Sequence, residues 1–590
     1  MAAGAFSGGH FPHRNRSLVI ADAARPCCTL PRHHLYNGPN QGADMSFITN
    51  KISAFVLTAC LGTALIGAFV FAAAPADKPA DKPVVGAGKY FKPDAVTSDG
   101  SVGTKAGRVN YTAVAGTLVV HAKDWDDVPV PTADKDDKEV QAEAAANPSA
   151  EASMFYVAYF KKGAGAGTRP ITFVFNGGPG SATVWLHMGA FGPRRVVTAD
   201  DSHTPAAPYS VVDNEGSLLD VSDLVFIDAP GAGFSRIAGK DKDKAFYGVD
   251  EDGRAFAEFI NEFLSKYSRW NSPKYIFGES YGTTRAAVLS NLLESNYAID
   301  LNGVIMLSQI LNFDMSVDGP QFNPGVNLPY QLALPTYAAT AWYHSDPKTR
   351  PADLHKLLGE VQHFAMGDYA MALQAGAALN DQQRNAIAQK LHQYTGLPVA
   401  YILKADLRID GGEFEQNLQG ANDTTTGRLD TRFSGPSMDP LAKEADYDPQ
   451  SAAISAAYIS AFNDYARNTL KYGEGKKYNL FADIHEWSFK HQQPGSPPLD
   501  GSPNVMPDLA AALKYNPNLK VMLNAGYYDL ATPYYEGIYE MRQLPMPRRL
   551  QANIEYKQYE SGHMVYAHQQ SLMELHDAVA DFIKRTENVK

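Results

Sequence analysis

The chain has 590 residues, of which 45% are hydrophobic and 20% charged, and its formal net charge is −12. This composition predicts a globular protein with a large buried core, and the acidic balance argues against a nucleic-acid partner, which favours a basic surface. The three cysteines, Cys27, Cys28 and Cys60, all precede the predicted start of the mature protein. The sequence therefore predicts no disulfide framework.

The N-terminal region has the pattern of a targeting sequence. Residues 1–44 lack helical or strand periodicity and are predicted to be an upstream mis-start or unstructured. Residues 45–76 are typical of a signal peptide, because Lys51 precedes an apolar run, Ser53–Phe71, and small residues follow that run. Residues 77–100, rich in Ala, Pro, Lys and Asp, are predicted to be a linker.

This pattern predicts export to the periplasm or the exterior. An uncleaved membrane anchor is the alternative, because the apolar run approaches the roughly 20 residues that span a bilayer. Leu57–Cys60 also resembles a lipoprotein cleavage box, although the chain stays apolar after it. No stable membrane partner is expected unless this segment is retained.

Beyond the linker, short apolar runs alternate with helical patterns. This alternation predicts an α/β architecture with a mixed, mostly parallel sheet, whose first part covers residues 101–310. The predicted strands are Thr117–His121, Phe155–Phe160, Ile171–Phe175, Leu224–Ile227, Tyr275–Phe277, Val304–Leu307, Val521–Leu523 and Ile554–Tyr559, and predicted helices include Gly253–Tyr267 and Arg285–Leu293.

The alternation is lost between residues 311 and 515, which we predict to be a largely helical cap insertion. Asp353–Ala375 has a helical pattern, and Asn380 with Gln383 forms a capping-box signature for a second helix that Gly396 ends. The second part of the core is predicted at 516–590. It closes with an amphipathic helix whose apolar positions are Leu572, Leu575, Val579, Phe582 and Ile583.

Ser280 is the predicted nucleophile. It is the central residue of Gly278-Glu-Ser280-Tyr-Gly282, which follows a predicted strand and precedes a helical pattern. A Gly-x-Ser-x-Gly sequence at such a junction is typical of the nucleophile elbow of the α/β-hydrolase fold, with small residues where the backbone is crowded.

The predicted acid and base are Asp529 and His563. In this fold the acid and the histidine follow the serine in that order, and each residue comes after a predicted strand, where the carboxyl ends of parallel strands meet a ligand. His563 would take the proton of Ser280, and Asp529 would stabilise the imidazolium. Taken alone, Asp529 is more simply explained as a turn aspartate, and His563 as a surface histidine.

A glycine-rich turn, Asn176-Gly-Gly-Pro-Gly-Ser181, follows the strand Ile171–Phe175. Such a turn lets backbone N–H groups face a reacting oxygen, as in an oxyanion hole. A phosphate-binding loop is disfavoured because no Gly-Lys-Ser/Thr follows. The remaining alternative is a tight turn with no chemical role.

Taken together, these motifs resemble those of the serine carboxypeptidases, peptidase family S10. The matching motifs are Asn176–Gly180, Asp228–Ser235, Gly278–Tyr281, Gly526–Asp529 and Gly562–Met564. The resemblance implies hydrolysis of the last peptide bond of a peptide, with no cofactor and no metal. It also implies that the N–H groups of Gly178 and Tyr281 form the oxyanion hole, and that Asn176, Gly177 and Glu279 bind the substrate carboxylate.

The sequence departs from the family pattern at three positions. Ala190 occupies the place of a second glutamate that the family pairs with the one beside the nucleophile, so the shared proton of that pair is in doubt. Ser181 replaces a cysteine, and Tyr527 replaces an aspartate.

Three other functions stay open on the sequence. A prolyl aminopeptidase also carries Gly-Gly-Pro-Gly, although Asn176 stands where that family has histidine. An esterase or acyltransferase can use the same scaffold. A non-catalytic exported binding protein would be expected to lose part of the Ser280, Asp529 and His563 set, which is complete here.

Overall fold

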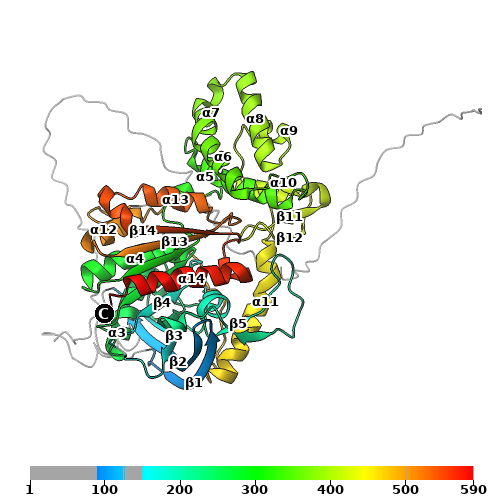
Figure 1. Ribbon diagram of the computed structural model, residues 1–590. Coiled ribbons are helices and arrows are strands. Elements are labelled where there is room, and N and C mark those ends of the chain that lie inside the picture. Colours follow the sequence, from blue (N-terminus) through cyan, green and yellow to red (C-terminus); the bar gives the residue numbers. More distant parts are fainter. Residues whose placement is uncertain (1–89, 124, 126–148, 166, 500, 589–590) are drawn as a thin grey trace, which may run out of the picture. The chain divides into compact units, whose positions relative to one another are not determined.

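The computed structural model describes residues 90–588 except 124, 126–148, 166 and 500. A sheet of ten strands forms its centre, with the order β1-β2-β3-β7-β4-β9-β10-β13-β14 and β8 paired to β3 (Figure 1). The strands are β1 (Ala95–Thr104), β2 (Gly107–His121), β3 (Glu151–Lys161), β4 (Ile171–Phe175), β7 (Asp223–Ile227), β8 (Arg236–Ala238), β9 (Lys274–Glu279), β10 (Gly303–Leu307), β13 (Lys520–Gly526) and β14 (Ile554–Tyr559).

The sheet is antiparallel at its N-terminal edge and parallel elsewhere. Neighbouring strands are antiparallel from β1 through β2 and β3 to β7. Neighbouring strands are parallel from β7 through β4, β9, β10 and β13 to β14. Parallel strands require crossovers, and helices supply them. All eight predicted strands are present, and the architecture is that of the α/β-hydrolases, as predicted.

Helices cover both faces of this sheet. On β9, Ile276 points to the face covered by α3 (Val249–Lys266), α4 (Tyr281–Asn296) and α12 (Met506–Tyr515). Its neighbours Tyr275 and Phe277 point to the opposite face, which α14 (Gln569–Thr586) and α11 (Pro449–Asp464) cover. This alternation gives two hydrophobic layers and explains why the central strands are apolar throughout.

A helical segment lies between β10 and β13 and encloses a hydrophobic cluster of its own. It contains α5 (Leu328–His344), α6 (Leu354–Phe364), α7 (Ala370–Ala375), α8 (Asp381–Thr395), α9 (Val399–Lys404), α10 (Gly411–Leu418) and the hairpin β11 (Thr424–Thr426) with β12 (Ser434–Pro436). Figure 1 shows these helices gathered on one side of the sheet. We call this segment the cap, and its predicted limits at 311 and 515 stay a proposal.

Two local predictions in the cap have different outcomes. Asn380 and Gln383 form the predicted capping box at the start of α8, and Gly396 ends that helix with a φ of 73°. The predicted helix Asp353–Ala375 is instead interrupted, because Gly367 departs from helical geometry between α6 and α7. A glycine lowers the cost of such a break.

The predicted linker 77–100 is wrong for residues 95–100, which belong to β1. β1 pairs with β2 along its whole length, yet it lies at the sheet edge and is mostly exposed. Its Ser, Thr, Gly and Asp residues therefore give no apolar alternation to detect. Residues 1–44, the predicted signal peptide 45–76, residues 77–89 and the three cysteines lie outside the described residues. Within the described ranges, no helix has both the length and the apolar character of a membrane span.

Candidate active site

Ser280 lies at a sharp junction between β9 and α4. Its backbone has a φ of 61° and a ψ of −132°, and its N–H donates to the carbonyl of Leu307 at 3.0 Å. A non-glycine residue in such a conformation typically stores about 1–3 kcal/mol of strain, which the surrounding structure must offset. A Cβ on Gly278 would come within 2.1 Å of the carbonyl oxygen of Gly282. The glycines of the motif are therefore required by the close backbone packing.

Asp529 and His563 form a buried hydrogen-bonded pair. His563 Nδ1 lies 2.9 Å from Asp529 Oδ2, and both side chains are at most 5% exposed. With Nδ1 as the donor to the carboxylate, Nε2 is left as an acceptor, which is the tautomer a general base requires. Asp529 follows β13 and His563 follows β14, as the sequence predicted.

The turn after β10 links Ser280 to His563. Ser280 donates its N–H to Leu307, and the hydroxyl of the next residue, Ser308, donates to the carbonyl of His563 at 2.7 Å. Because β9, β10, β13 and β14 are neighbouring parallel strands, their carboxyl ends bring Ser280, Asp529 and His563 to one edge of the sheet. Their catalytic roles stay a prediction.

Opposing influences act on the pKa of His563. Burial lowers this pKa, but the charge of Asp529 and its hydrogen bond outweigh burial, and Glu279 adds to their effect, so the net shift is upward. The imidazole therefore accepts a proton more readily than an ordinary histidine, and a base of this kind loses activity when acid protonates it.

Thr532 is a partner of Asp529 that sequence reasoning missed. Its hydroxyl donates to Asp529 Oδ2 at 2.8 Å and its N–H donates to Oδ1 at 3.0 Å. These bonds fix the carboxylate that faces His563. The signal available in the sequence was a threonine three residues after the aspartate, a common turn pattern that does not indicate a catalytic context.

The glycine-rich turn packs directly against the start of α4. A Cβ on Gly177 would meet the backbone nitrogen of Tyr281 at 2.4 Å, so only glycine permits this approach. Gly178 has a φ of 109°, in the region that favours glycine. Tyr281 is the first residue of α4, so its N–H has no acceptor within the helix. The structure thus packs the turn that carries Gly178 against the start of α4, where Tyr281 lies, and the oxyanion role of these two residues stays a prediction.

The Asp228 motif supports the same turn. Asp228 Oδ1 accepts the N–H of Thr183 at 2.8 Å, and the Thr183 hydroxyl in turn accepts the N–H of Asn176 at 3.3 Å. Arg285 of α4 holds the turn from the other side, donating to the carbonyl of Asn176 at 2.7 Å while paired with Asp252 of α3 at 2.6 Å. Both members of this pair are buried, and the sequence did not single them out.

Glu279, which precedes Ser280 in the chain, forms a buried polar cluster with Asn176. Asn176 Oδ1 accepts the N–H of Leu186 at 3.1 Å, which turns its amide nitrogen towards Glu279. Glu279 Oε2 accepts a hydrogen bond from the Tyr566 hydroxyl at 2.8 Å. Burial raises the pKa of Glu279 to about 7, against the opposing effects of His563, Tyr566 and Asn176. Glu279 is therefore largely protonated under mildly acidic conditions.

One cap segment, Arg428–Arg432, contacts both loops that carry the acid and the base. The carbonyl of Leu429 accepts the N–H of His563 at 2.6 Å, and Asp430 Oδ2 accepts the N–H of Gly562 at 3.2 Å. Towards the Asp529 loop, the N–H of Thr431 donates to Tyr528 at 2.9 Å, and the carbonyl of Arg428 accepts from Leu530 at 3.1 Å.

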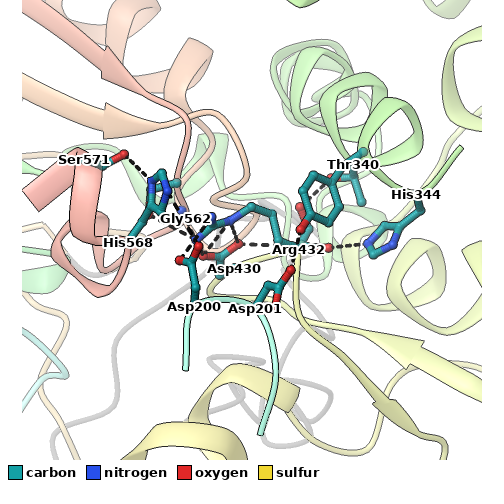
Figure 2. Close-up of polar contacts among 12 residues, drawn as sticks. Asp200, Asp201, Thr340, His344, Asp430, Arg432, Gly562, His568 and Ser571 are labelled. Atoms are coloured by element: carbon teal, nitrogen blue, oxygen red, sulfur yellow. Dashed lines mark hydrogen bonds and ion pairs between the residues drawn. The ribbon is translucent and has the colours of Figure 1, made fainter. Parts of the chain in front are cut away.

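Figure 2 shows how charged side chains fix this segment. Arg432 pairs with Asp430 at 2.7 Å and approaches Asp200 at 3.6 Å, and Asp200 also approaches His568 at 3.6 Å. On the cap side, His344 and Thr340 of α5 contact Thr431 at 2.6 Å each. The Arg428–Arg432 segment therefore links the cap to the loop that contains Asp200 and to the loop that contains His563.

No group of three or more His, Cys, Asp or Glu side chains suited to a metal ion occurs among the described residues.

A family model described as serine carboxypeptidase matches residues 142–320. This part of the chain is therefore similar to the serine carboxypeptidase family. The matched range includes Asn176, Glu279 and Ser280 and ends before Asp529 and His563.

Two carboxypeptidases and a proline iminopeptidase are similar to parts of the chain. A pheromone-processing carboxypeptidase KEX1 from Cryptococcus gattii is 30% identical over 118 residues, which cover 20% of this chain and 16% of that protein. Among solved structures, the prohormone-processing carboxypeptidase KEX1 from Saccharomyces cerevisiae is 14% identical, with a TM-score of 0.45, over 80% of this chain and 91% of that one. A proline iminopeptidase from Mycobacterium smegmatis is 13% identical, with a TM-score of 0.32, over 74% and 96%.

Proposed function

We propose that this protein is a serine-type carboxypeptidase that releases C-terminal residues from peptides. The match of residues 142–320 to the serine carboxypeptidase family model supports the reaction class. The ordered placement of Ser280, Asp529 and His563 at one edge of an α/β-hydrolase sheet supports the mechanism. The proposed peptide partner follows from the same reasoning, and none of these steps requires a cofactor.

In this mechanism the Ser280 hydroxyl attacks the carbonyl carbon of the last peptide bond while His563 Nε2 takes its proton. The N–H groups of Gly178 and Tyr281 stabilise the negative oxygen of the tetrahedral intermediate. Protonated His563 then gives its proton to the leaving amino acid, and the remaining peptide stays esterified to Ser280. Water activated by His563 hydrolyses this ester and restores the serine.

The buried position of Glu279 beside Ser280 is the observation that carries the choice of a carboxypeptidase. With its pKa raised to about 7 by burial, Glu279 exists as a neutral carboxyl group at mildly acidic pH. A neutral carboxyl group can donate a hydrogen bond to the substrate's terminal carboxylate, whereas a charged one would repel it. Asn176 and the N–H of Gly177 complete the proposed carboxylate site.

Export is part of the proposal. The support is the order of Lys51, the apolar run Ser53–Phe71 and the small residues after it, which is typical of a secretory signal peptide. A periplasmic or extracellular enzyme would meet peptide substrates there, with membrane anchoring through the same segment as the alternative.

The test compares N-blocked dipeptides that differ only at the C-terminus, as the free acid or the amide. We expect the purified protein to cleave the free acid at least about tenfold more efficiently, as one charged hydrogen bond to the carboxylate provides. Ser280→Ala should reduce kcat by about 10⁴-fold or more. Equal cleavage of acid and amide would refute carboxylate recognition, and full activity of Ser280→Ala would refute the mechanism.

A further inference from the structure

Glu279 lacks the second carboxyl group that its family context predicts. Ala190 stands at that position and is fully buried. The neighbouring residue Gly189 packs closely against two tyrosines, because a Cβ on Gly189 would lie 2.5 Å from the hydroxyl of Tyr458 and 2.7 Å from the ring of Tyr566. The segment that carries Ala190 therefore packs against Tyr566.

Tyr566 is the residue that contacts Glu279. Its hydroxyl donates to Glu279 Oε2 at 2.8 Å, and Tyr566 is 2% exposed. It belongs to the 3₁₀ turn Val565–Ala567, three residues after His563, so the loop that carries the catalytic base also positions this hydroxyl. Tyr566 therefore fixes the position of one oxygen of the Glu279 carboxyl group, Oε2.

We propose that Tyr566 replaces the missing second carboxyl group as the positioning residue for Glu279, so that substrate carboxylate recognition depends on a single proton held by Glu279. This inference rests on the proposed carboxypeptidase function. A glutamate pair shares one proton between two acids, and its partner can lose that proton. A tyrosine hydroxyl keeps its proton and orients Glu279 without competing for it.

The groups around Glu279 define the expected pH range. His563 and Asn176 lower the pKa of Glu279, Tyr566 does so through its hydrogen bond, and Asp529 raises it, while burial has the largest effect and raises it to about 7. Tyr458 of α11 also faces this cluster. Burial keeps the pKa of Tyr566 well above 10, so its hydroxyl stays a neutral donor while Glu279 titrates.

The test measures binding without turnover. In the Ser280→Ala protein, calorimetry would give the Kd of an N-blocked dipeptide acid and of its amide between pH 5 and 9. His563 titrates in both experiments. The Kd of the acid divided by the Kd of the amide therefore reports the titration of Glu279. We expect this ratio to rise about tenfold per pH unit above the Glu279 pKa, as loss of one proton requires.

Two substitutions then separate Tyr566 from a merely structural residue. Tyr566→Phe removes a donor that stabilises the carboxylate, so the midpoint of the rise should move to higher pH by about one unit. Glu279→Gln should make the ratio independent of pH. Tyr559→Phe is the matched control, since it removes another buried tyrosine hydroxyl, which donates to Asn524 at 2.9 Å, and should leave the midpoint unchanged.

An unchanged midpoint in Tyr566→Phe, or a wild-type rise in Glu279→Gln, would overturn the inference. These outcomes differ from failure of the proposed function. In that case the acid and the amide would bind equally at every pH, and the protein with Ser280 intact would cleave neither selectively.

Discussion

At position 177 the absence of a side chain decides how close the glycine-rich turn comes to Ser280. The backbone nitrogen of Tyr281 would lie 2.4 Å from a Cβ there, and the carbonyl oxygen of Glu279 would lie 2.7 Å from it. Both are backbone atoms of the serine junction and cannot rotate away. Any side chain at this position must therefore move the turn relative to Ser280.

We predict that Gly177→Ala lowers kcat by about 10²-fold, because a shift near 1 Å displaces an oxyanion donor. Steady-state kinetics on the dipeptide acid measures the loss. Gly359→Ala on α6 is the control, as no atom outside its own helix lies within 4 Å of a Cβ there, and it should retain wild-type kcat. A Gly177→Ala protein with normal kcat would show that the turn does not supply the oxyanion hole.

Residues within one motif could be predicted from the sequence, whereas their supporting partners could not. Ser280, Asn176 and Glu279 lie in short patterns that a single strand-to-loop junction explains. Tyr566 meets Glu279 across 287 positions, and Arg285 reaches Asn176 across 109. Such contacts depend on how strands are ordered in the sheet, and no local pattern encodes that order.

Among the elements, the Arg428–Arg432 segment has the largest effect on the site. It belongs to the cap by sequence position, yet its backbone pairs with the loops that carry Asp529 and His563. Asp430 is fully buried and bonds both Gly562 and Arg432. Neutralising Asp430 would leave Arg432 buried with a weakened partner, and loss of one member of a buried pair is costly.

We predict that Asp430→Asn lowers kcat by about tenfold or more and shifts the acidic limb of the kcat/KM profile, because the His563 loop loses its anchor. Asp406→Asn in the same cap is the control. Asp406 pairs with Arg408 at 2.9 Å but is 61% exposed, so its loss should leave the profile unchanged. A stability change in Asp430→Asn without a shift in the profile would contradict a role in positioning the base.

At this scale the sequence was informative wherever an element is buried. The apolar runs of β4, β7, β9, β10 and β13 predicted the parallel half of the sheet, because both faces of those strands are covered. β1 was not predicted, because it is largely polar and lies at the edge of the sheet. The break at Gly367 was also missed, because the apolar residues on either side continue a helical pattern.

At the scale of the whole molecule, ion pairs join segments that are distant in sequence, and no disulfide does so among the described residues, which contain no cysteine. One buried cluster joins three distant segments: His491 Nδ1 lies 2.5 Å from Asp250 of α3, and Nε2 lies 2.8 Å from Asp508 of α12. Burial lowers the pKa of His491, but its bonds to Asp250 and Asp508 outweigh burial and raise the pKa to about 9. Burial raises the pKa of Asp508, against the opposing effect of His491.

A histidine whose pKa is raised on folding stabilises the protein below its unfolded pKa of about 6.5, and this contribution is lost as pH rises through the folded value. We therefore predict that His491→Gln lowers the free energy of unfolding by about 2 kcal/mol at pH 6, allowing for the partial exposure of Asp250, and has little effect at pH 10. Denaturant unfolding at both pH values measures this difference. His485→Gln, at an 81% exposed side chain, should have no effect at either pH, and a pH-independent loss in His491→Gln would refute the linkage.

The Arg428–Arg432 segment also bears on how this enzyme could be re-engineered. A cap that rests on a core through side chains alone could be grafted between relatives to change substrate preference. Here a graft that replaces residues 428–432 would also replace the backbone acceptor of His563 and the support of Asp529. A chimera should therefore keep this segment with the recipient core and exchange only α5 to α10, which makes substrate selection separable from the catalytic centre.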